Sequence, residues 1–234
     1  MTPERFTRIN DMLNHRQPDL TVCLDQVHKP NNISAVVRTA DAVGVHEVHA
    51  IWPDPDMRVS GNTASGSQQW VNVKKHYQVK EAFDDCRAQG MQIIVTNFSD
   101  EAVDYREIDY TKPTAIVLGH EKDGISAEAL ALADKQVIIP MVGMVQSLNV
   151  SVAAALMLFE AKHQREQAGL YGINKLPDDY CQKLLFEQGH PIYAKACRKK
   201  GIPYPHIDEN GQIDAPDTWF EALRTTPDLD EFID

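Results

Sequence analysis

The chain has 234 residues, of which 43% are hydrophobic and 24% are charged, and its formal net charge is −11. This composition is typical of a soluble globular domain with room for extensions. No apolar run reaches the roughly 18 residues that a membrane-spanning helix needs, and the first residues lack the apolar region of a signal peptide. Four scattered cysteines form no CxxC motif, and no histidine stands at metal-ligand spacing. We therefore expect a cytoplasmic protein with reduced thiols, no membrane span and no bound metal.

The negative charge is concentrated at one end of the chain. Residues 202–234 hold nine acids and one base, whereas residues 161–200 hold eight bases and four acids. Such asymmetry fits a basic surface beside an acidic tail. Ordinary solvated faces explain the charges equally well, so this pattern permits an RNA partner without establishing one.

The first segment predicts an amphipathic helix that ends near Asn14. Thr2 is a suitable N-cap, Pro3 suits the first helical position, and apolar residues from Phe6 to Leu13 recur at helical spacing. Beyond residue 21, short apolar strands alternate with helices, which indicates an α/β domain with a mainly parallel sheet. We expect strands at 21–27, 47–52, 92–97, 115–119 and 136–140, and helices at 33–42, 80–89, 127–133 and 149 to about 165.

Ligands of parallel sheets bind beyond the carboxyl ends of the strands, and Asn97, Gly119 and Pro140 fall at such ends. After Gly169 we expect helices at 177–187, 191–200 and around 217–223. The chain is thus interpreted as an N-terminal helical extension (1–19), a catalytic domain (20–165) and a C-terminal helical extension with an acidic tail (166–234).

One candidate motif is NISAVVRTADAVGV, residues 32–45, where Asn32 can cap a helix. Arg38 lies in the middle of this small and apolar helix. Arginine is rarely buried without a partner, and its planar fork suits a phosphate or a carboxylate. A structural ion pair explains Arg38 as well as a functional role does.

Two further motifs each follow a predicted strand. In IVLGHEKDGIS, residues 116–126, Gly119 permits close backbone approach, Glu121 follows, and Ser126 can cap the next helix. In residues 137–160, a strand leads into a Gly- and Met-rich loop, and Asn149 caps a helix that is apolar on every face and is expected to be buried all round. The sequence has neither GxGxxG nor a phosphate-binding loop, which disfavours an unrelated nucleotide-phosphate enzyme.

Together, N-x-x-A-x-x-R-T-A, L-G-x-E-x-x-G and I-P-M-x-G-x-x-x-S-L-N-V-S-V-A resemble the SpoU/TrmH branch of the SPOUT methyltransferases. The match covers roughly residues 19–160. The resemblance implies S-adenosyl-L-methionine as methyl donor, S-adenosyl-L-homocysteine as product, ribose 2′-O-methylation of RNA, a homodimer and a C-terminal trefoil knot in the catalytic domain. The short N-terminal helix and the long C-terminal extension are most similar to the branch that methylates guanosine 18 in the tRNA D-loop.

The resemblance also assigns roles to residues. It implies a catalytic group of Arg38, Asn32, Glu121, Ser147 and Asn149. The methyl donor is expected at Thr96, Asn97, Leu118, Gly119, Ile139, Met141, Ser147 and Leu148. tRNA is expected on the basic residues Arg5, Arg8, Arg16, Lys74, Lys75, Arg165, Arg198, Lys199 and Lys200, because phosphate contacts supply affinity without sequence information.

A guanidinium is protonated throughout the working pH range, and a nearby phosphate stabilises that form further. We therefore expect Arg38 to act as a clamp that orients RNA and stabilises developing oxyanion charge, rather than as a base. The alternatives are a 2′-O-methyltransferase of another RNA (ribosomal RNA or the tRNA wobble position) and a non-catalytic RNA-binding protein on the same scaffold.

Overall fold

The computed structural model describes residues 1–52 and 69–224, which form two compact units. One unit comprises residues 16–173. The other combines residues 1–15 with residues 174–234, so the two ends of the chain belong together. None of the helices within the described ranges is long and apolar enough to cross a membrane. All four cysteines are buried free thiols, as expected.

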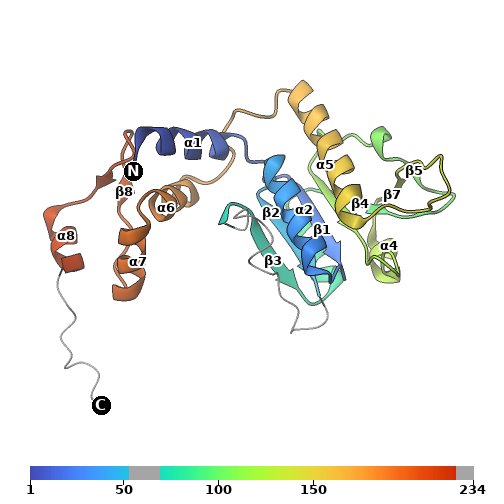
Figure 1. The fold of residues 1–234 in the computed structure, drawn as a ribbon, viewed down its shortest axis with the longest axis horizontal. Coiled ribbons are helices and arrows are strands. Elements are labelled where there is room, and N and C mark those ends of the chain that lie inside the picture. The colour runs from blue at the N-terminus through green and yellow to red at the C-terminus, as the bar shows by residue number, and fades with distance from the viewer. Residues whose placement is uncertain (53–68, 225–234) are drawn as a thin grey trace, which may run out of the picture. The chain divides into compact units, whose positions relative to one another are not determined.

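The larger unit is built on a sheet of seven described strands, all parallel (Figure 1). Its order is β3-β2-β1-β6-β4-β7-β5, so β1 and β6, distant in sequence, pair at the centre. The strands are β1 (Leu20–Asp25), β2 (Glu47–Ile51), β3 (Asn72–His76), β4 (Gln92–Thr96), β5 (Val103–Asp104), β6 (Thr114–Leu118) and β7 (Lys135–Ile138). The expected α/β class is confirmed, whereas the trefoil knot stays a prediction.

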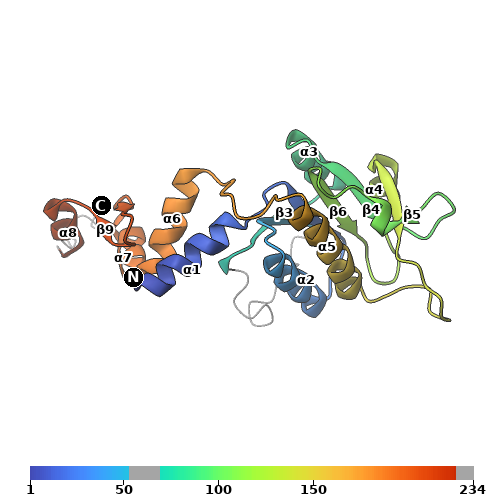
Figure 2. The same ribbon diagram turned by 90° about the horizontal axis from the view of Figure 1, so that it is seen from above.

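Two pairs of helices cover the two faces of this sheet (Figure 2). Successive strand residues point to opposite faces, so Val22 packs in one core and Cys23 in the other. The helices α2 (Pro30–Ala42) and α5 (Val150–Gln167) share the first core, and α3 (Val79–Ala88) and α4 (Ala127–Leu132) share the second. A short 3₁₀ helix, η2 (Tyr105–Glu107), follows β5.

The smaller unit contains helices and one small hairpin. Its first helix, α1 (Pro3–Asn14), packs on α6 (Asp178–Gly189). The Arg5 Nε donates to the carbonyl of Gln188 at 2.9 Å. The remaining elements are α7 (Pro191–Lys200), β8 (His206–Ile207), β9 (Ile213–Asp214) and α8 (Asp217–Arg224). Of the predicted acidic tail, residues 225–234 lie outside the described residues.

The predicted elements are confirmed to within a few residues, with specific exceptions. The strands β3 and β5 and the hairpin were not predicted, because β3 is mostly polar and exposed and the others are two residues long. Thr2, Ser126 and Asn149 cap their helices through side-chain oxygens, as expected. Asn32 is no cap, because the helix begins at Pro30 and places Asn32 in the first turn.

The helix α5 is also more exposed than predicted. Val152, Leu156 and Phe159 have exposed fractions of 46%, 39% and 53% in the single chain. These residues recur at helical spacing and therefore form one apolar stripe. Within a single chain, α5 is therefore not buried on this face.

Two of the arginines expected on the RNA surface are instead buried structural groups. Arg165 is 0% exposed and donates five hydrogen bonds, to the side chains of Gln17 and Asp19 and to three main-chain carbonyls. Arg16 is 2% exposed and bridges Asp41 to the carbonyl of Val45. Both guanidiniums are fully engaged within the fold, so the assignment of Arg16 and Arg165 to RNA binding is corrected.

We predict that Arg165→Met lowers the free energy of unfolding by roughly 3 kcal/mol, since it strands several buried acceptors. This is the low end for breaking a buried pair, because Asp19 is 31% exposed. Urea denaturation measures the change. Lys80→Met, on a side chain that is 65% exposed and pairs with Asp84, is the matched control and should leave the midpoint unchanged. A stable Arg165→Met protein would contradict this structural role.

Candidate active site

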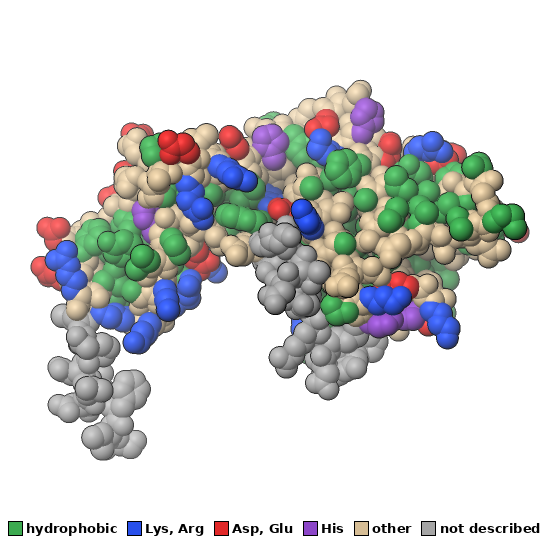
Figure 3. All heavy atoms as spheres, in the orientation of Figure 1, with side chains coloured by type: hydrophobic (Ala, Val, Ile, Leu, Met, Phe, Trp, Pro, Cys, Tyr) green, Lys and Arg blue, Asp and Glu red, His purple; other side chains and the backbone are tan. Residues whose placement is uncertain are grey.

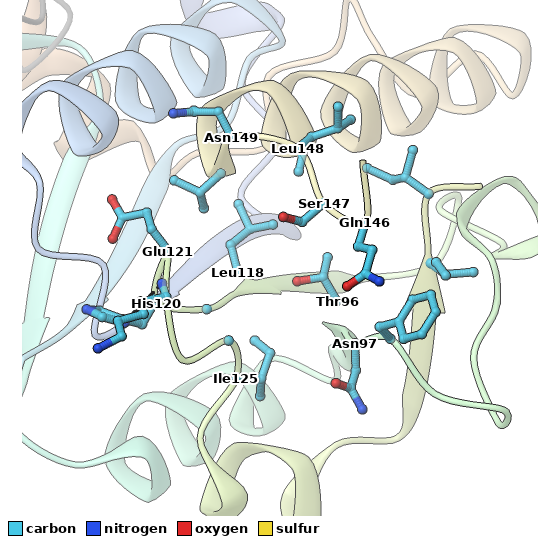
Figure 4. Close-up of a pocket in the computed structure, with 18 of the residues that line it drawn as sticks. Thr96, Asn97, Leu118, His120, Glu121, Ile125, Gln146, Ser147, Leu148 and Asn149 are labelled. Carbon is cyan, nitrogen blue, oxygen red and sulfur yellow. Dashed lines mark hydrogen bonds between the residues drawn. The ribbon is translucent and has the colours of Figure 1, made fainter. Parts of the chain in front are cut away.

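A cavity of about 560 Å³ opens at the carboxyl ends of β4, β6 and β7. Its other wall is the loop that leads into α5. Figure 4 shows Thr96, Ser147 and Gln146 close together between the end of β4 and this loop. The structure brings all of the expected methyl-donor residues to the lining: Thr96, Asn97, Leu118, Gly119, Ile139, Met141, Ser147 and Leu148. Parallel sheets place their ligand sites at this edge.

The floor of the cavity depends on the close approach of two glycines. After β6 the chain makes a tight turn in which the main chains of His120 and Gly124 exchange two hydrogen bonds of 2.9 Å. A Cβ at Gly119 would lie 2.3 Å from the carbonyl carbon of Gly124. Gly124 itself has φ +74°, which favours glycine. The sequence therefore needs glycine at both positions, and this turn carries Glu121 to the cavity.

Three polar side chains form a chain of hydrogen bonds at one end of the cavity. Asn149 Nδ2 donates to Asn32 Oδ1 at 3.2 Å, and Asn32 Nδ2 donates to Glu121 Oε1 at 2.5 Å. The carbonyl oxygen of the Asn149 side chain meanwhile accepts from the Ser151 amide and caps α5. The start of α2, the turn after β6 and the start of α5 thus meet here. Three of the five expected catalytic residues, Asn32, Glu121 and Asn149, form this chain, and a fourth, Ser147, lines the same cavity.

Glu121 is held in its ionised form. Burial alone would raise the pKa of its carboxyl, but the hydrogen bond from Asn32, the local main chain and the neighbouring Lys29 and His28 together lower the pKa below its ordinary value of 4.5. Its Oε2 is buried without a hydrogen bond, although His28 Nδ1 approaches it to 3.5 Å. The carboxylate therefore keeps one oxygen with spare acceptor capacity at the cavity wall.

Several lining residues have no signal in the sequence patterns. Gln146 precedes Ser147 in an irregular loop, and His120 accepts hydrogen bonds from the Lys122 and Asp123 amides in the tight turn. Phe98, next to Asn97, lines the cavity although it is 77% exposed. For Phe98, the only indication in the sequence is an aromatic residue that follows directly after an apolar strand segment.

The structure does not bring Arg38 to the cavity of its own chain. Arg38 is exposed on α2, six residues beyond Asn32 and so about 9 Å further along the helix axis. Among the basic residues expected to meet RNA, Arg5, Arg8, Lys74, Lys75, Arg198 and Lys199 are exposed. Lys200 is half-buried and donates to main-chain carbonyls at the end of α8.

Three features characterise the class to which this protein belongs: the parallel α/β sheet, the loop-walled cavity at its carboxyl edge, and this chain of polar side chains. Comparison with family models names that class. The SpoU rRNA Methylase family model matches residues 19–159, and the "SpoU, rRNA methylase, C-terminal" model matches residues 163–216. The chain belongs to the SpoU methylase family.

Individual enzymes and solved structures of this family are also similar to the chain. The chain is 56% identical over 226 residues to the tRNA (guanosine(18)-2′-O)-methyltransferase of Escherichia coli, covering 96% of this chain and 99% of the relative. The enzyme of the same name from Thermus thermophilus is 52% identical over 79% of this chain and 95% of its own. Among solved structures, the A. aeolicus TrmH/SpoU tRNA modifying enzyme superposes with a TM-score of 0.74 at 39% identity, covering 81% of this chain and 96% of that one. The SpoU methyltransferase AviRb from Streptomyces viridochromogenes, in complex with the cofactor AdoMet, gives 0.59 at 30% identity, over 65% and 62%.

Asn32→Ala should raise the pKa of Glu121 relative to the wild type, because the hydrogen bond from Asn32 is the largest of the influences that oppose burial. In the wild type the ionised carboxylate adds stability above pH 4.5, which is lost as the pH falls through the lowered pKa; in the variant this contribution is smaller. Titration of the Glu121 carboxyl carbon by NMR measures the shift. The neighbouring exposed Asn31→Ala is the control, and an unchanged Glu121 titration in Asn32→Ala would contradict the argument.

Proposed function

We propose that this protein transfers a methyl group from S-adenosyl-L-methionine to the ribose 2′-hydroxyl of guanosine 18 in the D-loop of tRNA, in the cytoplasm. The observation that carries the proposal is the identity of 56% across nearly the whole of both chains to an enzyme with that name. The match covers 226 of the 234 residues, so it includes most of the N- and C-terminal extensions as well as the catalytic unit.

The cavity suits the methyl donor. Its volume lies within the range of small-molecule sites. Leu118, Leu148 and Val150 offer apolar contacts to an adenine, and the main chain near Gly119 and Met141 offers polar groups. A bulkier residue at Gly119 would push the turn out of place. The bound cofactor supplies an electrophilic methyl on a sulfonium, and S-adenosyl-L-homocysteine is the product.

The polar chain of Asn32, Glu121 and Asn149 would position the reacting groups. Because Asn32 is tied to both the turn after β6 and the start of α5, it fixes the width of the cavity mouth. The ionised Glu121 brings negative charge near a positively charged sulfonium, which favours binding. Ser147 lines the same cavity and would offer a hydroxyl to the ribose.

Arg38 is proposed to act on the RNA rather than on the methyl donor. Its side chain is exposed and lies outside the lining of the cavity, which fits a group that meets a large substrate. A guanidinium that holds a phosphate and faces the attacking oxygen stabilises the charge that develops on it, without itself losing a proton. This role requires the planar fork of arginine.

The RNA surface is proposed to include exposed basic residues of the smaller unit. Arg5 and Arg8 lie on α1, and Arg198 and Lys199 lie at the end of α7. Contacts of this kind give affinity that falls with salt, while the choice of nucleotide depends on the shape of the opened loop. Arg198 is already oriented by Glu187 and the Tyr204 hydroxyl, so it is partly preorganised.

A homodimer is proposed to form over the exposed face of α5. Figure 3 shows hydrophobic side chains gathered on the side of the larger unit that carries this helix. The stripe of Val152, Leu156 and Phe159 adjoins the loop before α5, where Val142 and Met144 are also exposed. Exposed apolar surface of this extent marks a protein interface. A second copy on this face would support the loop that walls the cavity.

Phe159→Glu should therefore shift the protein to monomers and reduce methyl transfer, because it places a charge in the apolar interface. Sedimentation velocity measures the oligomeric state. Ile173→Glu, at a residue that is 63% exposed and outside the stripe, is the matched control. A Phe159→Glu protein that sediments as the wild type does would exclude this face as the interface.

The function is tested with tritiated S-adenosyl-L-methionine on unmodified total tRNA, on ribosomal RNA, and on a tRNA transcript whose guanosine 18 is replaced by cytidine. We expect label in tRNA only, mapped to nucleotide 18, and none in the replaced transcript. Label in ribosomal RNA or at the wobble position would overturn the substrate. Binding of tRNA without any label would favour a non-catalytic RNA-binding protein.

In the same assay, Arg38→Lys should lose most of the turnover, about 10²-fold or more, because a point charge cannot replace the fork. Affinity for S-adenosyl-L-methionine, measured by calorimetry, should remain near the wild-type value. Near-normal turnover in Arg38→Lys would show that the fork geometry does not matter.

A further inference from the structure

Two histidines and a carboxylate converge on the opposite face of the sheet from α5. His49 lies on β2, His76 at the end of β3, and Asp85 on α3. His49 Nδ1 is 2.9 Å from His76 Nε2, and the same His76 nitrogen is 3.8 Å from Asp85 Oδ2. One ligand atom from each residue lies within 4.8 Å of the other two. None of the three lines the methyl-donor cavity.

These distances bracket the separation of ligands around a tetrahedral metal ion. With metal–nitrogen distances near 2.0–2.1 Å, neighbouring ligand atoms are roughly 3.3 Å apart. The 2.9 Å and 3.8 Å separations lie on either side of this value. The third pair, His49 and Asp85, lies within 4.8 Å, so coordination requires the Asp85 carboxylate to move toward the two histidines.

The ligand groups are in the forms that bind metal. Burial, followed by the neighbouring His49, lowers the pKa of His76, so its imidazole is neutral at neutral pH. The hydrogen bond from Lys74 is the largest influence on Asp85 and lowers the pKa of its carboxyl, which is therefore ionised. Neutral imidazole and ionised carboxylate are the forms that coordinate a metal.

A fourth residue orients one of the histidines. His49 Nε2 lies 3.5 Å from Glu47 Oε1, so the nitrogen that does not face His76 points toward a carboxylate. In metal-binding histidines a carboxylate often accepts the second ring N–H and fixes the tautomer, and Glu47 is the carboxylate nearest to this nitrogen of His49. Glu47 is itself held by a 2.5 Å hydrogen bond from Asn72 on β3.

We propose that His49, His76 and Asp85 form a binding site for a divalent transition metal, with Zn²⁺ as the ion that two imidazoles and a carboxylate suit best. The ion replaces the proton shared by the two histidines and links β2, the edge strand β3 and α3. This revises the expectation of a metal-free protein. Sequence spacing gives no warning of the site, because the three ligands come from three separate elements.

The other histidine group of the described residues is less suited to a metal. It consists of His28, His120 and Glu121 beside the cavity. There the His120 Nδ1 already accepts from two main-chain amides, and Glu121 Oε1 accepts from Asn32. His28 is half-exposed. These groups are engaged by the fold of the cavity wall.

Lys74 competes with the ion for Asp85. Its Nζ lies 2.5 Å from Asp85 Oδ2, and both side chains are partly exposed, at 46% and 38%. Entry of a cation therefore requires Lys74 to leave. Removal of this ammonium should tighten metal binding, whereas removal of the carboxylate should weaken it.

The test uses the untagged full chain after treatment with a chelator. Co²⁺ is titrated as a spectroscopic probe of tetrahedral coordination, and thermal unfolding is measured with and without Zn²⁺. We expect visible Co²⁺ absorption that Zn²⁺ displaces, and a Tm rise of about 5–10 °C at Zn²⁺ concentrations 100-fold above Kd. Asp85→Asn should weaken binding on the order of 10–100-fold, and Lys74→Met should strengthen it several-fold.

Asp84→Asn is the matched control, because Asp84 is the exposed neighbour of Asp85 and pairs with Lys80 outside the cluster. It should bind Co²⁺ as the wild type does. His76→Gln provides a second ligand variant, while Asp85 is partly exposed and its variant is expected to fold. No Co²⁺ absorption and no Zn²⁺ shift would mean that the histidines share only a proton. Undiminished binding in Asp85→Asn, or loss on His120→Gln instead, would also overturn the site.

Discussion

The buried guanidinium of Arg165 is the contact on which the geometry of the active site depends. It joins the C-terminal part of α5 to the segments that lead into β1 and β6, the two central strands. At its other end, α5 begins at Asn149, which caps the helix and bonds to Asn32. A helix held at both ends presents a fixed wall to the cavity. Precise placement of this kind is what an in-line methyl transfer requires.

Local physical chemistry accounts for most of what could be predicted from the sequence. Short apolar runs located the buried strands and helical spacing located the helices, and Thr2, Ser126 and Asn149 act as the predicted caps. The residues that line the cavity were predicted from the ends of the strands and from the family resemblance of the three motifs. The failures share a different cause. Whether Arg165 faces RNA or the interior depends on acceptors far away in the chain, which no local pattern contains.

Dependence on residues far away in the chain also explains why the role of Asn32 and the histidine cluster were not predicted. Asparagine is a residue type that often caps helices, but this helix already begins at Pro30. The side-chain amide group of Asn32 is therefore available to Glu121 and Asn149. His49, His76 and Asp85 each read as an ordinary residue of its own element. Only the pairing of β2 with β3, and the packing of α3 across them, brings the three together. The sheet thus keeps two polar sites apart, with the candidate active-site cavity at the carboxyl edge and the histidine cluster beneath α3.

The order of the strands also governs how the chain can fold. The central pair joins Val22 to Ile116, so most of the catalytic unit must be synthesised before β1 meets its inner neighbour. A parallel pair of this kind closes a long loop, and the chain loses this conformational entropy before the strand contacts compensate for it. Folding is therefore slow. Until β6 arrives, one edge of β1, a strand that is fully buried in the finished fold, leaves its backbone groups open to wrong partners. During its synthesis the enzyme therefore needs protection from wrong strand partners. The stability of the finished fold does not reveal this need.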